Sequence, residues 1–261
     1  MYCKSVHCFR IRTGTSDFKQ KGSIISIDGE ESFGAWEPSS SCDRLKGSIE
    51  PSTLPAGLGP TFNLLVPVMC RNIDMVSQEN LTISGIDVTR YIADPRSLAQ
   101  DSCYCPDPQT PCLPSGYLNL EPCYPEISPP MAVSFQHGLH SPPNQMLTHP
   151  PSPNTTAHHM YMDINTKLGV PLAVQVRFQL SAVLRPDPYF PILNKLNSTK
   201  LVPLFWASEG FDQPTSWMVG NTKLALALPS AAALGLAGGL LMLGVCTVLG
   251  GLCLRKRRSR I

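Results

Sequence analysis

The sequence predicts a mainly β fold with short helices (an α+β class), followed by one C-terminal transmembrane helix. Three observations lead to this prediction. Proline accounts for 26 of the 261 residues, about twice its usual share, and proline breaks helix interiors. Apolar and polar residues alternate in the body of the chain, as they do in strands. A run of 31 residues near the C-terminus carries no charge. A helical bundle is therefore excluded for most of the chain.

Strand signals begin in residues 22–36, where apolar residues alternate around Ile25 and Ile27. Asp28-Gly29 then predicts a hairpin turn, because both residue types accept a positive φ. Residues 172–184 alternate over seven positions and predict a half-buried strand. The predicted apolar face consists of Val174, Val176, Phe178 and Leu180. The predicted polar face consists of Gln175, Arg177 and Gln179.

Two other segments have special features. Residues 64–76 are expected to form a short helix that carries Cys70. Residues 201–206 are expected to form a short apolar strand. Pro203 interrupts that strand and has no backbone N–H, so the strand belongs at a sheet edge or contains a bulge.

The uncharged run, residues 224–254, is long enough to cross a membrane. A helix needs about 20 residues for this, and Pro229 lies near the start of the span, where proline is tolerated. A buried helix of a soluble protein is the alternative, but such helices rarely continue so far without a polar residue. The tail, residues 255–261, follows with five basic side chains, which predicts a cytosolic tail and an outside location for residues 1–223. A nuclear-localisation signal is the less favoured interpretation of the tail.

The charges of the body and the tail differ. The whole chain has 21 Lys and Arg against 19 Asp and Glu, a net charge of +2. The tail holds five of these basic residues, so residues 1–254 keep 16 basic residues against 19 acidic residues, a net charge of about −3. A nucleic-acid-binding body is disfavoured, because it needs clustered positive charge.

The predicted span carries two further motifs. Ala231, Gly235 and Gly239 recur every four residues on one face, which lets another helix approach closely and predicts a homo-oligomer through the transmembrane helix. Cys253 lies at the cytosolic boundary beside basic residues and is a candidate palmitoylation site. An unmodified boundary cysteine is the alternative.

Cysteines and glycosylation sequons both indicate an oxidising compartment. Asn80, Asn154 and Asn197 begin three sequons. Ten cysteines occur, and the six that lie in residues 42–123 are expected to form disulfides, with their pairing left open. A zinc site is not expected, because Cys103-Tyr-Cys105 is tighter than the usual ligand spacing.

Residues 103–153 hold 13 of the 26 prolines, so disulfides rather than a strand ladder are expected to order them. Five of the six histidines lie between His137 and His159. The pairs His137/His140 and His158/His159 suit a metal site or a pH sensor, but exposed or loop-packed histidines are the favoured interpretation. No nucleophile elbow, phosphate loop or dinucleotide fingerprint occurs, so neither an enzyme nor a bound cofactor is expected.

A longer set of motifs follows one order along the chain. They are Phe9-Arg-Ile11-Arg-Thr13-Gly14, Gly22, Asp28-Gly29, Trp36, Cys42-Asp43-Arg-Leu45-Lys-Gly47-Ser48, Pro55, Cys70-Arg71-Asn-Ile73, Gly85-Ile86, Arg90-Tyr91, Cys103-Tyr104-Cys105, Cys112, Gly116-Tyr-Leu118-Asn-Leu120-Glu-Pro-Cys123, His137, Tyr161-Met-Asp163-Ile164, Gly169, Leu172, Arg177-Phe-Gln179 and Val202-Pro203-Leu-Phe-Trp206. In this order and spacing the chain resembles the class B scavenger receptor family, whose members include fatty-acid translocase, the high-density-lipoprotein receptor and a lysosomal integral membrane protein.

The resemblance implies part of an antiparallel β-barrel ectodomain, with a lipid-conducting tunnel and a transmembrane helix at each end of a family member. It also implies three disulfides: Cys42–Cys103, Cys70–Cys123 and Cys105–Cys112. The chain corresponds to roughly the C-terminal half of a member, which predicts a fragment, an incomplete gene model or a short isoform. The departures from the family pattern are Cys3 and Cys8, Gly47-Ser48-Ile49-Glu50 in place of Gly-Thr-Asp-Gly, and Gln136-His137 in place of Pro-His.

The function implied by the resemblance is that of a plasma-membrane scavenger receptor. Its expected partners are the membrane and lipids, fatty acids or lipoprotein particles, and it would transfer apolar ligand towards the bilayer. A lysosomal membrane receptor and lipid exporter is the alternative, disfavoured because the tail has no acidic dileucine signal. A truncated, modulatory fragment that dimerises through its span is the third hypothesis.

Overall fold

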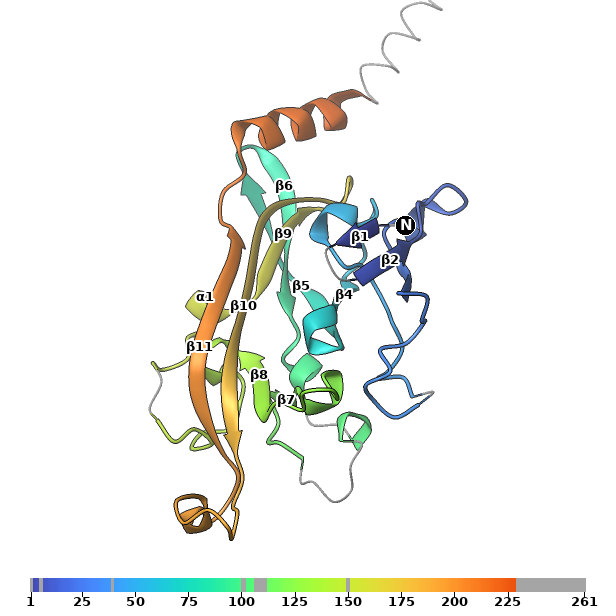
Figure 1. The fold of residues 1–261 in the computed structure, drawn as a ribbon. Helices are drawn as coiled ribbons and strands as arrows, with labels where there is room; N and C mark the ends of the chain where they lie inside the picture. Colours follow the sequence, from blue (N-terminus) through green and yellow to red (C-terminus); the bar gives the residue numbers. More distant parts are fainter. Residues whose placement is uncertain are drawn as a thin grey trace, which may run out of the picture. The chain divides into compact units, whose positions relative to one another are not determined.

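The computed structural model describes residues 2–4, 7–38, 40–99, 102–105, 112–148 and 151–228. The chain divides into two compact units, Met1–Pro214 and Thr215–Ile261. In the second unit the described part is a helix over residues 216–228. The first unit holds the strands and the other short helices (Figure 1). This distribution confirms the mainly β class with short helices.

The strands of the first unit, in chain order, are β1 (Tyr2–Lys4), β2 (His7–Ile11), β3 (Ile24–Ile27), β4 (Thr61–Val66), β5 (Arg71–Ile83), β6 (Ile86–Ala93), β7 (Tyr117–Asn119), β8 (Met131–Phe135), β9 (Tyr161–Asn165), β10 (Val170–Leu184) and β11 (Lys200–Phe211). Its helices are one α-helix and eight single turns of 3-10 helix among the described residues: α1 (Thr155–His158), η1 (Phe18–Gln20), η2 (Pro51–Thr53), η3 (Pro67–Met69), η4 (Pro95–Leu98), η5 (Ser102–Tyr104), η6 (Glu121–Cys123), η7 (Gln136–Gly138) and η8 (Leu193–Lys195).

Two antiparallel sheets organise these strands. A small sheet has the order β1-β2-β3, and a large sheet has the order β4-β5-β6-β9-β10-β8-β7, with β11 paired to β10. Over the described residues the large sheet is open rather than closed on itself, so the barrel closure implied by the resemblance is not found.

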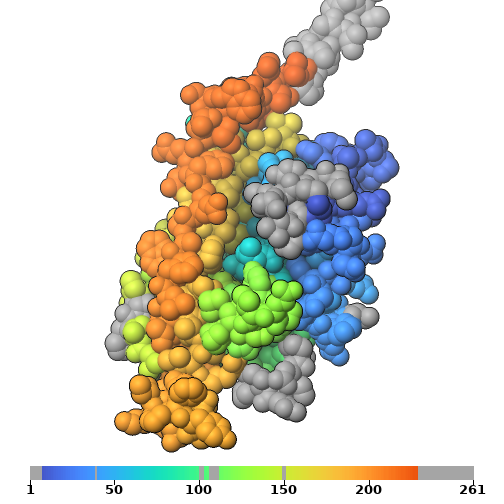
Figure 2. All heavy atoms as spheres, viewed as in Figure 1, coloured from blue at the N-terminus to red at the C-terminus, as the bar shows by residue number. Residues whose placement is uncertain are grey.

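The large sheet divides along β10. Residues 170–175 of β10 pair with β9, and residues 178–182 pair with β8 on the same edge. The opposite edge of β10 is occupied by β11. Arg177 therefore lies at the point where β8 and β9 separate, and the β10–β11 hairpin flanks the first unit on one side (gold and orange in Figure 2).

The helix predicted over residues 64–76 is wrong. Residues 61–66 and 71–83 are the antiparallel strands β4 and β5, joined by the single turn η3. The physical reason is the period of burial: Arg71, Ile73 and Met75 are buried at every second position, as in a strand. Cys70 ends the turn in a left-handed conformation with φ of 45°, which reverses the chain between the strands.

The hairpin and edge-strand predictions are confirmed. Asp28 and Gly29 both have positive φ, and Ile27 pairs with Glu30 across the turn. The strand predicted over residues 201–206 is the middle of β11, which borders β10 alone among the described strands. The register shifts next to Pro203, so this strand is both an edge and bulged.

The strand over residues 172–184 is confirmed, but its predicted faces need correction. The amide of Gln179 is only 1% exposed, and Gln175 is buried, whereas Val176, Phe178 and Leu180 are half-buried. The polar face is covered because Gln179 accepts a hydrogen bond from the His137 backbone N–H at 3.2 Å. Both faces are covered because η7 and Met146 pack on the side of Gln179, while the main core packs on the side of Phe178.

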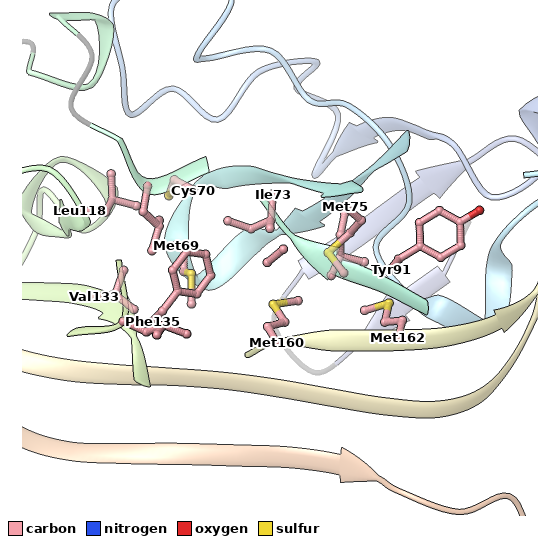
Figure 3. Packing of buried hydrophobic residues seen from close by; sticks show 14 of the residues in the cluster. Met69, Cys70, Ile73, Met75, Tyr91, Leu118, Val133, Phe135, Met160 and Met162 are labelled. Carbon is pink, nitrogen blue, oxygen red and sulfur yellow. The ribbon is translucent and has the colours of Figure 1, made fainter. Parts of the chain in front are cut away.

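The main core lies against β5, β6, β8 and β9. Figure 3 shows side chains of these strands pointing towards one another, with sulfur-containing residues prominent among them. The residues labelled there are Met69, Cys70, Ile73, Met75, Tyr91, Leu118, Val133, Phe135, Met160 and Met162. Tyr91 keeps its hydroxyl satisfied by donating to Gly59 O at 2.8 Å, so the ring contributes apolar area without leaving a polar atom unpaired.

Candidate functional site

Three disulfides tie the proline-rich segment to the sheet. Their Cα–Cα distances are 6.1, 5.8 and 5.7 Å for Cys42–Cys103, Cys70–Cys123 and Cys105–Cys112, the same pairs that the resemblance implies. The first two close long loops, with sequence separations of 61 and 53 residues, and the third closes a separation of 7. In the small sheet, Cys8 is disulfide-bonded and lies opposite Cys3 in the backbone register.

Aromatic contacts fix the Cys70 turn. The indole N–H of Trp36 donates to Cys70 O at 2.6 Å, and the Trp36 ring meets Tyr104 edge-to-face at 5.0 Å. The Arg71 guanidinium lies 3.5 Å from the Tyr104 ring centroid. The buried Trp36 therefore connects the Cys70 turn after η3 with Tyr104 in η5, beside Cys103 of the other long-loop disulfide.

A cavity of about 470 Å³ opens beside this cluster. Its lining is mainly apolar and comes from the β3 turn, the segment before Trp36, η3 and the Cys70–Cys123 region: Ile27, Asp28, Glu30, Ser32, Phe33, Gly34, Pro67, Val68, Cys70, Cys123 and Tyr124. The Tyr124 hydroxyl donates to Val68 O at 2.9 Å. Desolvation raises the pKa of Tyr124, so the phenol stays neutral. A cavity of this size with a mainly apolar lining suits an apolar ligand, and Asp28 and Glu30 are the acidic residues of that lining.

A second apolar surface runs along β10. Val176, Phe178 and Leu180 pack against the main core without being fully buried, together with Phe211 of β11. Val176, Phe178 and Leu180 were predicted to share a face with Val174, and they line the core side of the sheet, where Phe211 joins them. Together they give the described sheet an apolar inner surface.

The structure pairs the histidines differently from the sequence: His137 contacts His158, and His140 contacts His159. His137 is buried and meets the His158 ring at 4.5 Å and the Trp206 ring at 5.7 Å. His140 and His159 face each other with their Nε2 atoms 3.0 Å apart. Desolvation lowers the pKa of His137, His140 and His159. Among the described residues, no group of three or more His, Cys, Asp and Glu side chains is arranged to hold a metal ion.

One ion pair in this region was not foreseen. Arg90 donates from Nε and Nη2 to the two carboxylate oxygens of Asp163, both at 2.7 Å, and Asp163 is 1% exposed. Both residues belong to motifs of the resemblance, but they lie 73 positions apart in the sequence. Their place in motifs of the resemblance was the only signal for them, and no local pattern indicates that β6 and β9 are neighbours.

The three sequon asparagines are exposed. Asn80 lies in β5, Asn197 lies in the β10–β11 connection, and Asn154 caps α1 by accepting from the backbone N–H groups of Thr156 and Ala157. Exposure leaves each of them accessible, and their glycosylation stays a prediction.

The C-terminal predictions fall outside the described residues. These are Ala231, Gly235, Gly239, Cys253, the tail 255–261 and all of the span except residues 224–228. Within the part of the chain that the structure describes, no helix has both the length and the apolar composition needed to cross a membrane. The span, its packing face and the lipidation site stay predictions.

Comparison with known proteins matches these features to one family. The CD36 family model matches residues 3–254. Sensory neuron membrane protein 1 of Helicoverpa assulta is 28% identical over 211 residues, which cover 78% of this chain and 39% of that protein. The Bombyx mori protein of the same name is 28% identical over 210 residues, with the same coverage. Protein peste of Drosophila melanogaster is 28% identical over 206 residues, or 76% of this chain and 36% of peste.

The chain thus spans about two fifths of the length of these relatives. The family match, by contrast, covers nearly the whole chain, including the β-rich first unit with Cys42–Cys103, Cys70–Cys123 and Cys105–Cys112. The protein therefore belongs to the CD36 family, the class B scavenger receptor family that its cysteine motifs resemble.

Proposed function

We propose that the chain is part of a membrane scavenger receptor that binds lipids, fatty acids or lipoprotein particles and passes apolar ligand towards the bilayer. The observation that carries the proposal is membership of the CD36 family over residues 3–254, a range that includes the uncharged C-terminal run. The names of two relatives as membrane proteins support a membrane location. The proposed compartment is the plasma membrane, with residues 1–223 outside and residues 255–261 in the cytosol.

The proposed ligand-binding region is the apolar cavity beside the Cys70–Cys123 disulfide. Its volume of about 470 Å³ accommodates part of an acyl chain, and most of its lining is apolar, with Asp28 and Glu30 as the acidic residues. Each methylene group that leaves water for such a cavity contributes about 0.8 kcal/mol. Binding and transfer of this kind need no covalent chemistry, so the proposed role is not enzymatic.

Val68 offers a direct test, because it lines the cavity and is already 60% exposed, so that a substitution there spares the core. In Val68→Asp a carboxylate must be desolvated beside the bound chain. If it displaces two methylene groups, the loss of about 1.6 kcal/mol lowers fatty-acid affinity roughly tenfold. The measurement is saturable binding of labelled oleate by cells that display the full chain.

Ile192→Asp is the matched control, because Ile192 is 83% exposed in the β10–β11 connection and lies outside the cavity lining. This variant is expected to bind oleate like the unmodified chain. Binding no greater than that of mock-transfected cells would refute the proposed function. Equal binding by the two variants would refute the role of the cavity.

A further inference from the structure

A polar cleft lies where β8 and β9 separate along β10. Its volume is about 270 Å³, below the usual range for drug-sized ligands, so it suits a single small group. Five elements or their flanks line it: Gln78 and Glu79 from β5, Arg90 and Ile92 from β6, Thr155 and Thr156 from α1, His159 and Tyr161 at the start of β9, and Arg177 from β10. The lining is therefore rich in hydrogen-bond donors, including two guanidinium groups.

The two arginines of the cleft differ in how their charge is matched. Arg90 is held by the buried Asp163 and lies 3.7 Å from Glu79. Arg177 donates to Ser208 Oγ at 3.4 Å and to His159 O at 3.0 Å, both neutral acceptors. The ion pairs of the described residues give Arg177 no carboxylate partner. Arg177 therefore brings to the cleft a positive charge that forms no ion pair among the described residues, whereas Glu79, the acidic residue of the lining, pairs with Arg90.

Tyr161 holds both arginines in place. The Arg90 and Arg177 guanidinium groups lie 4.5 and 5.5 Å from its ring centroid. Its hydroxyl donates to Asp212 at 3.0 Å, and Gln175 also donates to Asp212 at 2.7 Å. Asp163 and Asp212 thus already accept hydrogen bonds from these neighbours. The remaining acidic side chain at the cleft, Glu79, is half exposed to solvent.

The His140–His159 pair adds a site for one proton at the cleft. With both rings neutral, one Nε2 donates to the other across 3.0 Å. A proton added at Nδ1 of the donor ring keeps this bond and leaves the pair with a charge of +1. Desolvation lowers the pKa of both histidines, and Arg177 lowers that of His159 further. Their protonation is therefore shifted to lower pH than that of an ordinary histidine, and it is favoured by any anion in the cleft.

We propose that this cleft binds a small oxyanion of the sulfate or phosphate type, free or as a lipid headgroup. Arg177 provides the main positive charge, Thr155 and Thr156 add hydroxyl groups, and uptake of one proton by the His140–His159 pair strengthens binding. A tetrahedral oxyanion matches the forked donors of a guanidinium. The proposal is independent of the apolar cavity and of lipid transfer, because inorganic sulfate alone tests it.

The first experiment is calorimetric titration of the full chain in detergent with sodium sulfate, against sodium chloride at equal ionic strength. Arg177→Gln is expected to weaken sulfate binding at least about tenfold, because it removes a charge-assisted contact. Arg12→Gln is the control, since Arg12 is an exposed arginine outside the cleft and its loss changes net charge equally. Equal sulfate affinity in the two variants overturns the proposal.

The second experiment repeats the titration at about pH 7.5 and about pH 5.5, on either side of the ordinary histidine value. Sulfate keeps its charge across this window, so a change in affinity reports on the protein. The unmodified chain is expected to bind sulfate more tightly at the lower pH, because sulfate binding is linked to uptake of one proton. His140→Asn removes the pair but tolerates the left-handed backbone of residue 140, and it should abolish this increase. A His140→Asn variant that keeps the increase overturns the role of the pair.

A third titration distinguishes the source of the oxyanion. The full chain is placed in phosphatidylcholine nanodiscs with or without phosphatidic acid, and sulfate binding is measured again. If phosphatidic acid competes with sulfate in the unmodified chain, the site accepts a lipid headgroup. If it does not compete, the site is specific for the free oxyanion. Absence of any Arg177-dependent binding of sulfate or of phosphatidic acid overturns the proposal.

Discussion

Arg90 and Asp163 form a bidentate pair whose acidic partner is almost inaccessible to water. Sequence motifs drew attention to both residues, but nothing in a local pattern could join positions 73 apart. The same holds for Gln179, which alternation assigned to a polar face and which the sheet buries against the η7 turn. The sequence could therefore single out individual residues, but it could not predict which residues they contact, because each contact comes from a distant segment.

Arg90→Met is expected to destabilise the fold by about 3 kcal/mol, because it leaves the Asp163 carboxylate buried without its partner. The Arg185–Glu121 pair serves as the control. Its Nη1–Oε1 distance is 2.8 Å, but both side chains are about a quarter exposed, and Arg185→Met is expected to cost about 1 kcal/mol. Urea unfolding of the purified chain measures both. Equal losses would show that burial of Asp163 does not determine the cost.

Gly47 and Ser48 join the two sheets at the scale of elements. Gly47 O accepts from Ile24 N at 2.8 Å, and Ser48 bridges to both Ser23 and Leu64. This is the segment in which the chain departs from the family's Gly-Thr-Asp-Gly run. Strand periodicity predicted β10, the middle of β11 and the turn after β3, whereas it missed β5, because a one-turn helix interrupts an apolar stretch there. Periodicity indicates which side chains share a face of a strand, but it does not indicate where one element ends and the next begins.

Gly47→Ala is expected to cost about 3 kcal/mol, since Gly47 has a positive φ and an added Cβ would overlap Asn63 O. Gly34→Ala is the matched control. Gly34 also has a positive φ, but nothing lies within 4 Å of an added Cβ, so about 1 kcal/mol is expected. Chemical unfolding distinguishes the two, and an equal cost would refute close approach of the sheets at Gly47.

The whole first unit depends on covalent links across the proline-rich segment. Cys42–Cys103 and Cys70–Cys123 connect the region after β3 and the turn before β5 with η5 and η6. The Cys70–Cys123 link lines the apolar cavity, so this disulfide contributes both to the shape of the proposed ligand site and to the stability of the unit. Over the described residues, the large sheet has open edges. The chain spans about two fifths of the length of its relatives.

Loss of the Cys70–Cys123 disulfide in the Cys70→Ala/Cys123→Ala variant is expected to cost about 4 kcal/mol, because it closes a long loop. The Cys105→Ala/Cys112→Ala variant is the control, since its loop is short and about 2 kcal/mol is expected. Thermal unfolding under non-reducing conditions compares them. A larger loss for the short loop would contradict the loop-entropy explanation.

The sequence by itself determined the mainly β class, the hairpin at Asp28-Gly29 and the bulged edge strand at Pro203, since each depends on local backbone preferences. Its cysteine motifs also led to the family and, through it, to the three disulfide pairs. Only the tertiary structure decided the open order of the sheet, the buried glutamines of β10, the Arg90–Asp163 pair and the facing His140 and His159. All of these require segments far apart in the chain to meet, and the packing of the whole sheet, rather than any local pattern, selects which of them do.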